Sequence, residues 1–390
     1  MLRTMPRKTT SIDLRLPPLA ELHERRSLKW DGHAPDVLAA TVAEMDFPLA
    51  PPVAAALHAA VDRHDLGYAH ASIGRLAEAF AGFAERRLGW RVDPERVRLL
   101  PDAMVGVIEL ARMLAGEDRS VALATPAYRP FLDDLPTFGL DVREVPLRDD
   151  GATDLDGLRS EFERGTRVFL LANPHNPTGR VLPRSELERL AELCAKRDVW
   201  VIADEIHAPL TLPGASHVPW LEVSDAARSC GIALTSASKA FNLAGLKAAL
   251  LVTASERARA AADRLPPQEV HAGLLGVVAA EAAFAEGDAW LDAVLAQLDA
   301  NRDLLGRLLS EQLPEVRWTP PQASYLAWLD CHALGLGDDP AETLLERGRL
   351  ALAPGTDYGR SGAGYARLNF GTSPEIVADM VQRMARAVPR

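Results

Sequence analysis

The sequence predicts an α/β protein: a large domain built on a mainly parallel, seven-stranded sheet, beside a smaller α+β domain. From about residue 95, short apolar runs alternate with stretches of helical spacing, which is typical of parallel strands joined by crossover helices. Towards the C-terminus this rhythm gives way to short strands mixed with helices. The length of 390 residues allows two to three domains at about 150 residues each.

Seven apolar runs are expected to be the strands of the sheet. They are too short for helices, and their nearly continuous apolar character is typical of strands covered on both faces. Helical spacing separates most of them, and the connections are expected to be right-handed. The runs are Val97–Leu100, Val121–Thr125, Val142–Val145, Val168–Ala172, Val199–Ala203, Ile232–Thr235 and Ala248–Val252.

The rest of the chain is assigned to two further parts. Residues 1–47 show no strand–helix rhythm and are expected to pack with the small domain. The large domain is placed at 48–285 and the small domain at 286–390. A long helical region crosses that boundary, and shorter elements follow it. They are helical Ala272–Leu313, strands Tyr325–Leu329 and Arg367–Phe370, and helices Ala341–Arg347 and Pro374–Val388.

Charge and composition exclude several classes of protein. The chain has 43 basic and 54 acidic residues, a net charge of −11, so no basic footprint for nucleic acid or anionic lipid is expected. No apolar stretch is long enough for a membrane span. The first 18 residues lack the apolar core of a secretory signal. Three dispersed cysteines are typical of a reducing compartment, so we expect a cytoplasmic protein.

The first motif with possible chemistry is Asn173-Pro174-His175-Asn176-Pro177-Thr178-Gly179, directly after an apolar run. Prolines and glycine end the strand in a rigid loop. The loop brings asparagine amides to the carboxyl edge of the sheet, where α/β proteins bind ligands. A single Asn-Pro would indicate only a turn, but the full run favours a site.

The second motif, Val201–His207, ends an apolar strand with Asp204, Glu205 and His207. A buried carboxylate needs a cationic partner, and a protonated heterocycle would suit. Capping carboxylates beside a core histidine are the plainer interpretation of this motif. No Walker A sequence and no second histidine cluster accompany it, so we expect neither a helicase nor a metal site.

The third motif surrounds Lys239. Ser236, Ser238 and Lys239 follow the apolar run that ends at Thr235, and Lys247 comes eight residues later. Small hydroxyl side chains can hold a phosphate, and a lysine amine can form a Schiff base with an aldehyde. Most lysines are merely solvated, so this motif is weak by itself.

Two further segments point to anion recognition. Arg367 opens Arg367–Gly371 and suits bidentate capture of a carboxylate, although a surface ion pair is the commoner role of one arginine. Ala103 and Met104 begin a helix after a strand, where free N–H groups favour phosphate. Asp102 is expected to cap that helix and not to contact the phosphate.

In their order and spacing, these motifs resemble the fold-type I pyridoxal 5′-phosphate (PLP) enzymes of the class I and II aminotransferase family. The resemblance runs from about Lys29 to the end of the chain. Finer marks are similar to the MalY/PatB branch, which contains cystathionine β-lyases and other cysteine C–S lyases. Those marks are Lys29-Trp30-Asp31, Ala43-Glu44-Met45-Asp46-Phe47, Gly67-Tyr68, Thr125-Pro126-Ala127-Tyr128, Asp204-Glu205-Ile206-His207, Ser324–Leu329 and Pro354-Gly355.

The resemblance implies roles around the cofactor ring. Lys239 would form the Schiff base with PLP and act as the general base. Asp204 would pair with the pyridinium nitrogen, and Asn176 would hydrogen-bond the 3′-oxygen, with His207 nearby. Tyr128 would stack on the ring and is counted with Lys239 and Asp204 as catalytic.

It also implies roles at the phosphate and the substrate. Ser236, Ser238 and the amides of Ala103 and Met104 would hold the phosphate. Lys247 stands where many relatives have arginine, and it either binds the phosphate or faces solvent. Arg367 would clamp the substrate carboxylate with help from Asn173. Tyr68 would reach the cofactor of a neighbouring subunit, which implies a homodimer.

The predicted function is therefore a PLP-dependent C–S β-lyase that converts cystathionine or another L-cysteine S-conjugate to a thiol, pyruvate and ammonia. An aminotransferase on the same scaffold is the alternative, because the same residues would serve it. A specialised biosynthetic enzyme acting on a larger cysteine S-conjugate is a third possibility. A transcription regulator with this fold is disfavoured, because no room remains for a DNA-binding domain.

Overall fold

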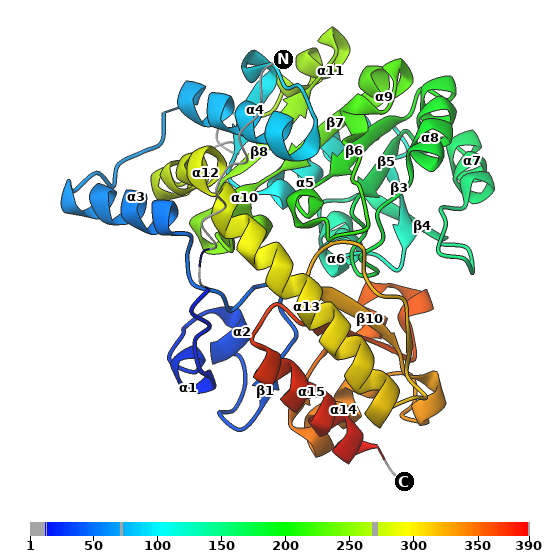
Figure 1. Ribbon diagram of the computed structural model, residues 1–390. Coiled ribbons are helices and arrows are strands. Elements are labelled where there is room, and N and C mark those ends of the chain that lie inside the picture. The colour runs from blue at the N-terminus through cyan, green and yellow to red at the C-terminus, as the bar shows by residue number, and fades with distance from the viewer. Residues whose placement is uncertain (1–11, 13, 71–72, 267–271, 389–390) are drawn as a thin grey trace, which may run out of the picture.

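The seven apolar runs form one sheet in the computed structural model, which describes residues 12, 14–70, 73–266 and 272–388 (Figure 1). Residues 1–11 and 13 of the expected N-terminal segment lie outside that description. The strand order is β2-β8-β7-β6-β5-β3-β4, and only β8 runs antiparallel to its neighbours, which confirms the predicted fold class. The strands are β2 Val97–Leu100, β3 Ser120–Thr125, β4 Asp141–Pro146, β5 Val168–Ala172, β6 Trp200–Asp204, β7 Gly231–Thr235 and β8 Ala249–Thr253.

Helices cover both faces of this sheet, so alternate side chains of a strand enter different cores. On β5, Phe169 and Leu171 join one apolar cluster, and Val168 and Leu170 join the other. Helices α5, α6 and α11 supply the second cluster, and the remaining long helices of this body supply the first. The helices are α3 Pro51–Asp62, α4 Gly74–Leu88, α5 Ala103–Leu114, α6 Arg129–Thr137, α7 Leu155–Glu163, α8 Arg184–Lys196, α9 Asp225–Cys230, α10 Ala237–Ala240, α11 Glu256–Ala262 and α12 Leu274–Glu286.

Side-chain caps fix where the helices beside the site begin. Asp102 accepts a hydrogen bond from Met104 N at the start of α5, as expected. Ser236 Oγ accepts from Ser238 N at the start of α10. Each cap satisfies an otherwise free amide in the first turn, so both helices begin directly after a strand.

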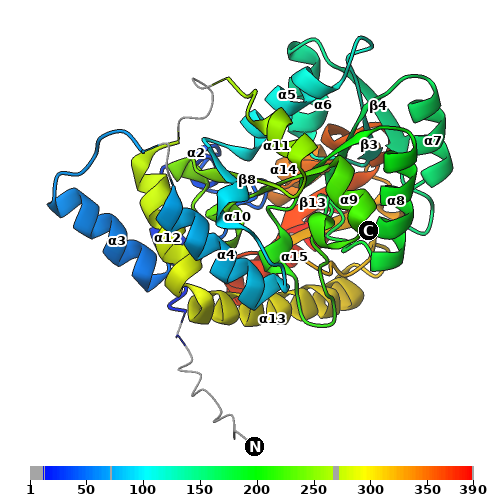
Figure 2. The ribbon, with the colours of Figure 1, turned by 90° about the horizontal axis from the view of Figure 1, so that it is seen from above.

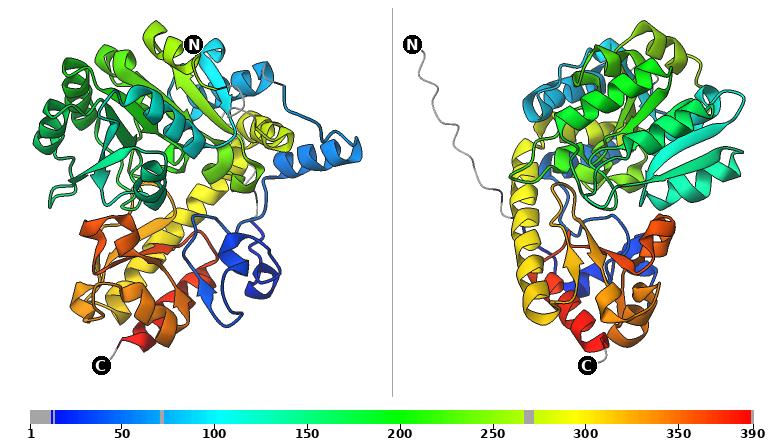
Figure 3. Two further views of the ribbon diagram at one scale, coloured as in Figure 1. Left: turned by 180° about the vertical axis from the view of Figure 1, so that it is seen from behind. Right: turned by 90° about the vertical axis from the view of Figure 1, so that its right-hand side faces the viewer.

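The smaller body is built on a four-stranded antiparallel sheet, in the order β12-β13-β10-β9. The N-terminal segment joins this body, because β1 pairs in parallel with β11 through Leu38↔Leu350 and Ala39↔Ala351. Figures 1 and 3 show the two bodies one above the other. The elements are α1 Leu19–Leu22, α2 Leu28–Asp31, β1 Leu38–Ala39, α13 Asp288–Gln312, β9 Arg317–Trp318, β10 Leu326–Asp330, α14 Pro340–Gly348, β11 Leu350–Ala351, β12 Ala353–Pro354, β13 Tyr365–Asn369 and α15 Pro374–Ala387.

The predicted helical region Ala272–Leu313 is divided into α12 and α13 at Gly287. A Cβ at Gly287 would lie 2.4 Å from both Ala283 O and Phe241 Cε1, so only glycine fits this close approach. The 25-residue α13 then runs from the large body down the side of the small one (Figure 1). The expected domain boundary at 285/286 lies at the end of α12 and stays a prediction.

Helix α3 projects away from the body and packs along α12 (Figures 1 and 2). Several apolar side chains on α3 and on either side of it are open to solvent. Leu49, Val61 and Leu66 are exposed, and Tyr68 is 99% exposed. An isolated antiparallel bridge joins Tyr68 to Gly273, just before α12.

Candidate active site

The predicted site residues come from both bodies and meet at the carboxyl edge of the large sheet. Strand β5 leads into the Asn173–Gly179 loop, β6 ends at Asp204, and β7 leads to Lys239. Arg367 reaches them from β13 in the smaller body, where its guanidinium donates to Asn176 Oδ1 at 3.1 Å. The amine, the carboxylate and the guanidinium therefore lie together at the carboxyl edge of the sheet, where α/β proteins bind ligands.

Lys239 is a buried amine in α10. Its Nζ donates to the backbone oxygen of Ala43, at 3.1 Å. Burial and the nearby Arg367 guanidinium lower the pKa of Lys239, which outweighs the opposite effect of Glu44 and Asp204. A lowered pKa favours the neutral amine, which is the form that attacks an aldehyde or takes up a proton.

Asp204 is a buried carboxylate at the end of β6. Its Oδ1 accepts from Ile206 N at 3.2 Å, and burial raises the pKa of Asp204 to about 6. The ionised form is therefore short of positive charge in this structure. A protonated ring nitrogen would supply that charge, so the site fits the heterocycle that the sequence predicted.

The two rings expected around the cofactor are uncharged. Burial lowers the pKa of His207 to about 3, so its imidazole is neutral, and its Nδ1 has no partner among the described residues. Burial raises the pKa of Tyr128 to about 12, so its hydroxyl keeps its proton. Both side chains can therefore contact a cofactor ring as neutral groups.

The asparagine loop gives its two amides different surroundings. Asn176 holds Arg367, as above. Asn173 is fully buried and its Oδ1 accepts from Leu182 N at 3.0 Å, while its Nδ2 has no partner among the described residues. Gly179 lets the loop close, because its φ is +67° and a Cβ there would lie 2.3 Å from Pro321.

A segment that no motif predicted as part of the site lies across it. We call Thr41–Asp46 the strap. Its backbone oxygens accept from the predicted site residues: Thr41 O from Arg367 Nη2 at 2.7 Å and Ala43 O from Lys239. The Tyr325 hydroxyl also donates to Ala43 O, at 2.8 Å. Lys239 and Tyr325 therefore share one acceptor.

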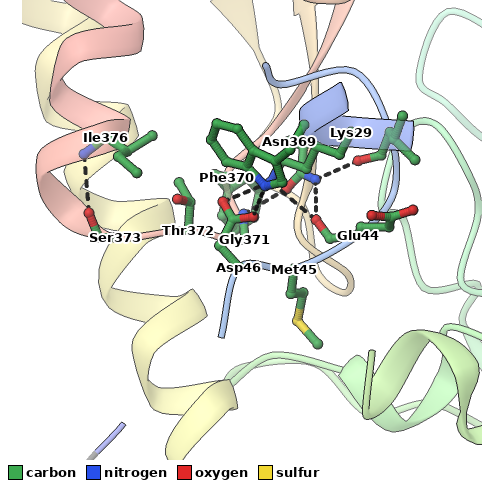
Figure 4. A network of polar contacts seen from close by, with 12 residues as sticks. Lys29, Glu44, Met45, Asp46, Asn369, Phe370, Gly371, Thr372, Ser373 and Ile376 are labelled. Carbon is green, nitrogen blue, oxygen red and sulfur yellow. Dashed lines mark hydrogen bonds and ion pairs between the residues drawn. The ribbon is translucent and has the colours of Figure 1, made fainter. Parts of the chain in front are cut away.

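Two asparagine side chains, far along the chain from the strap, hold it in place. Asn369 Nδ2 donates to Val42 O and Glu44 O, at 2.6 and 2.7 Å (Figure 4). Asn242 Oδ1 accepts from Met45 N at 2.9 Å, and Asn242 Nδ2 donates to Met45 O at 2.8 Å.

The C-terminal end of the strap is fixed by a buried ion pair. The Lys29 amine lies 2.8 Å from Asp46 Oδ2, and Trp30 Nε1 donates to Asp46 Oδ1 at 2.8 Å (Figure 4). Two of the finer sequence marks, around Lys29 and around Asp46, thus contact each other.

The predicted phosphate ligands are only partly free in this structure. Met104 N donates to Asp102, and Ser236 Oγ donates to Ala248 O at 2.7 Å. Lys247 Nζ lies 2.8 Å from Asp102 Oδ2 and forms an ion pair with it. The sequence did not predict this carboxylate partner. Tyr68 is exposed and is held near Gly273, as described above.

Neither a metal site nor a membrane-spanning helix occurs among the described residues. They contain no group of three or more His, Cys, Asp or Glu side chains that could hold a metal ion. No helix within them is long and apolar enough to cross a membrane. The three cysteines, all within the described part, are buried and free.

Comparison with known proteins gives consistent matches. The model of the family "Aminotransferase class I and II" matches residues 36–384. A cystathionine β-lyase of Corynebacterium glutamicum is 35% identical, over 95% of this chain and 99% of its own length. The cystathionine β-lyase PatB of Bacillus subtilis is 33% identical, over 93% and 97%. The PLP-bound C–S lyase of Staphylococcus hominis is similar in structure, with a TM-score of 0.87, 26% identity and 99% of both chains covered.

Proposed function

The chain belongs to the family of class I and II aminotransferases, and from this premise we propose that it is a PLP-dependent C–S β-lyase. Its substrate is cystathionine or another L-cysteine S-conjugate, and its products are a thiol, pyruvate and ammonia. One observation carries the proposal: a buried amine of lowered pKa, a buried carboxylate and a buried guanidinium meet at one sheet edge. The relatives named as C–S lyases support it.

Each site residue around the cofactor has a role that follows from its charge and position. When bound, PLP supplies an aldehyde for the amine and a ring that takes up the electron pair left at the substrate Cα. Asp204 would keep the ring nitrogen protonated, and the ring's positive charge would balance the buried carboxylate. Asn176 and His207 would contact the ring's oxygen, and Tyr128 would cover its face. The phosphate would be held by Ser236, Ser238, Ala103, Met104 and Lys247.

Arg367 and Lys239 act on the substrate. Arg367 binds the α-carboxylate, and Asn173 assists it from the loop that also carries Asn176. Lys239 Nζ, whose pKa burial lowers, takes the proton from Cα as general base. The thiolate then leaves from Cβ of the substrate. Hydrolysis of the rest of the substrate releases pyruvate and ammonia. An aminotransferase would instead return the proton to the cofactor.

We also propose a homodimer in which Tyr68 reaches the partner's cofactor phosphate. The fully exposed tyrosine and the exposed apolar side chains near it support this. Three free thiols support a reducing compartment, and we propose the cytoplasm.

The test is the visible absorbance of the purified protein with PLP, before and after L-cystathionine, with pyruvate assayed in the same sample. We expect a visible band and pyruvate from the wild type, and neither from Lys239→Ala. The control variant Lys196→Ala changes an exposed lysine at the end of α8, which has no assigned role in the site, and keeps the band. Conversion to pyridoxamine phosphate without pyruvate would establish the aminotransferase instead. Absence of any band from the wild type would overturn the assignment of Lys239.

A further inference from the structure

Tyr358 is a buried aromatic residue that no sequence motif assigned to the site. It ends the short 3₁₀ helix η7, Gly355–Tyr358, and only 3% of its surface is exposed. The guanidinium carbon of Arg367 lies 5.0 Å from the centre of its ring. Arg367 is itself 4% exposed, so the two groups meet away from water, where a cation–π contact is strongest.

The other contacts of Arg367 leave one of its three nitrogen atoms without a partner among the described residues. Its Nη1 donates to Asn176 and its Nη2 to Thr41 O, so the loop and the strap hold one end of the guanidinium. Its Nε is buried and has no partner among the described residues. A buried donor without a partner is costly, and an incoming carboxylate would satisfy it.

Both bodies of the molecule contact the segment of Tyr358, the small body at its ring and the large body at its backbone and at Asp357. Trp328 of β10 packs edge-on against it, with ring centres 5.2 Å apart. Tyr358 O accepts from Ala127 N at 2.9 Å, and the neighbouring Asp357 accepts from Arg129 Nη1 at 2.9 Å. Ala127 directly precedes Tyr128, so the same short helix contacts the residue beside the predicted ring-stacking tyrosine.

We propose that Tyr358 is a positioning residue for carboxylate recognition. Its ring face holds the Arg367 guanidinium in the plane that presents Nε to the substrate α-carboxylate. This inference rests on the proposed function, in which Arg367 binds that carboxylate. The ring face of Tyr358, and not its hydroxyl, positions the guanidinium, so Tyr358 does not act through a hydrogen bond.

The experiment measures how well the PLP-loaded protein distinguishes a carboxylate from its neutral amide. L-Alanine and L-alaninamide are titrated separately, and the visible absorbance change gives a dissociation constant for each. The ratio of the two constants reports recognition of the carboxylate alone. The variants are Tyr358→Phe, which keeps the ring, and Tyr358→Leu and Tyr358→Met, which remove it. Tyr365→Leu is the matched control, because Tyr365 stacks on Trp328 in the same aromatic cluster without contacting Arg367.

We expect Tyr358→Leu and Tyr358→Met to lose roughly tenfold of the wild-type preference for L-alanine. Tyr358→Phe and Tyr365→Leu keep it. In turnover of an S-alkyl cysteine, the ring-removing variants raise KM by a similar factor and change kcat little, which a general loss of packing would not do.

An unchanged preference in Tyr358→Leu or Tyr358→Met would overturn the proposal, and so would a lost preference in Tyr358→Phe. Removing only a hydroxyl leaves the packing intact, so that variant gives an answer even if the smaller ones do not fold. Failure of the proposed function shows separately, as absence of a visible band from the wild type. In that case propionate binding to the cofactor-free variants, measured by calorimetry, decides the role of Tyr358.

Discussion

Burial sets the protonation of Asp204 before any ligand is present. Its pKa is raised from 3.8 to about 6, so the folded protein holds this proton more tightly than the unfolded chain does. Stability from this group is therefore greatest at low pH and falls as the pH rises from about 4 to above 6. At neutral pH the ionised carboxylate costs the cofactor-free protein about 3 kcal/mol.

Asp204→Asn is accordingly expected to stabilise the cofactor-free protein at pH 7.5. The difference between its free energy of unfolding and that of the wild type should be about 1.5 kcal/mol smaller at pH 5 than at pH 7.5, because the wild-type carboxyl becomes protonated at the lower pH. Urea unfolding of both proteins at the two pH values measures this. Other groups titrate in both proteins, so they cancel in the difference. An advantage that is constant with pH would contradict the raised pKa.

Asp102 places a carboxylate where the phosphate of PLP is proposed to bind, and it engages Lys247. Asp102→Asn keeps the oxygen that caps α5 but removes the charge and releases the lysine. We expect PLP to bind about threefold more tightly at low salt, and the gain to fade at high salt, because exposed charges are screened. Titration of the cofactor-free protein with PLP measures the effect.

A control for that variant is Asp339→Asn, which alters the same kind of cap on α14, away from the site. It should leave PLP binding unchanged. Weaker PLP binding in Asp102→Asn would mean that Asp102 serves the phosphate by orienting Lys247.

Several site residues were predictable from sequence because each follows an apolar run. Asp204 is the last residue of β6, Asn173 directly follows β5, and Lys239 lies in α10 just beyond β7. The partners of these residues were not predictable. Ala43 and Thr41 contribute backbone oxygens, which leave no trace in a sequence. Lys29 has the character of a surface residue, yet it is fully buried because Asp46, 17 positions later, folds back on it.

The strap depends on the buried pair of Lys29 and Asp46. Lys29→Met is expected to destabilise the protein by about 3–5 kcal/mol, because it leaves the Asp46 carboxylate buried without its cation. Urea unfolding measures the loss. The exposed Lys196→Met is the matched control and should change stability by less than about 0.5 kcal/mol.

The double variant Lys29→Met with Asp46→Asn tests the reason for that loss. Asparagine keeps an acceptor for Trp30 and carries no charge, so the double variant should be more stable than Lys29→Met alone. Equal losses in the two would mean that the lysine stabilises the strap by packing and not by charge.

Strands and helices differ in how well their bounds follow from sequence. Buried on both faces, the strands of the large sheet are continuous apolar runs, so β5 and the predicted Val168–Ala172 coincide. The division at Gly287 was not predicted. The ring of Phe241, which leaves no room for a side chain at Gly287, is 46 residues away in the chain.

The proposed dimer makes a prediction for mixed subunits. Tyr68→Ala and Lys239→Ala should each be nearly inactive alone. When the two chains are mixed during refolding, one site of each mixed dimer combines native Lys239 with native Tyr68. Random pairing then restores about a quarter of wild-type activity, because half the dimers are mixed and one of their two sites is intact. Mixed dimers of the right mass without recovered activity would place Tyr68 outside the partner's site.

The strap also fixes when the site can first exist during synthesis. Thr41 is made early, but its partner Arg367 follows 326 residues later, and Asn369 follows Val42 by 327. At about 5–20 residues per second, a ribosome needs roughly 15–65 s to span that interval. Once β8 has been made the large sheet can form, but until β13 follows the strap lacks the donors of Arg367 and Asn369. Docking of the N-terminal segment is therefore a last step of folding, and a chain released before β13 would carry Lys239 and Asp204 on a finished sheet that lacks its carboxylate clamp.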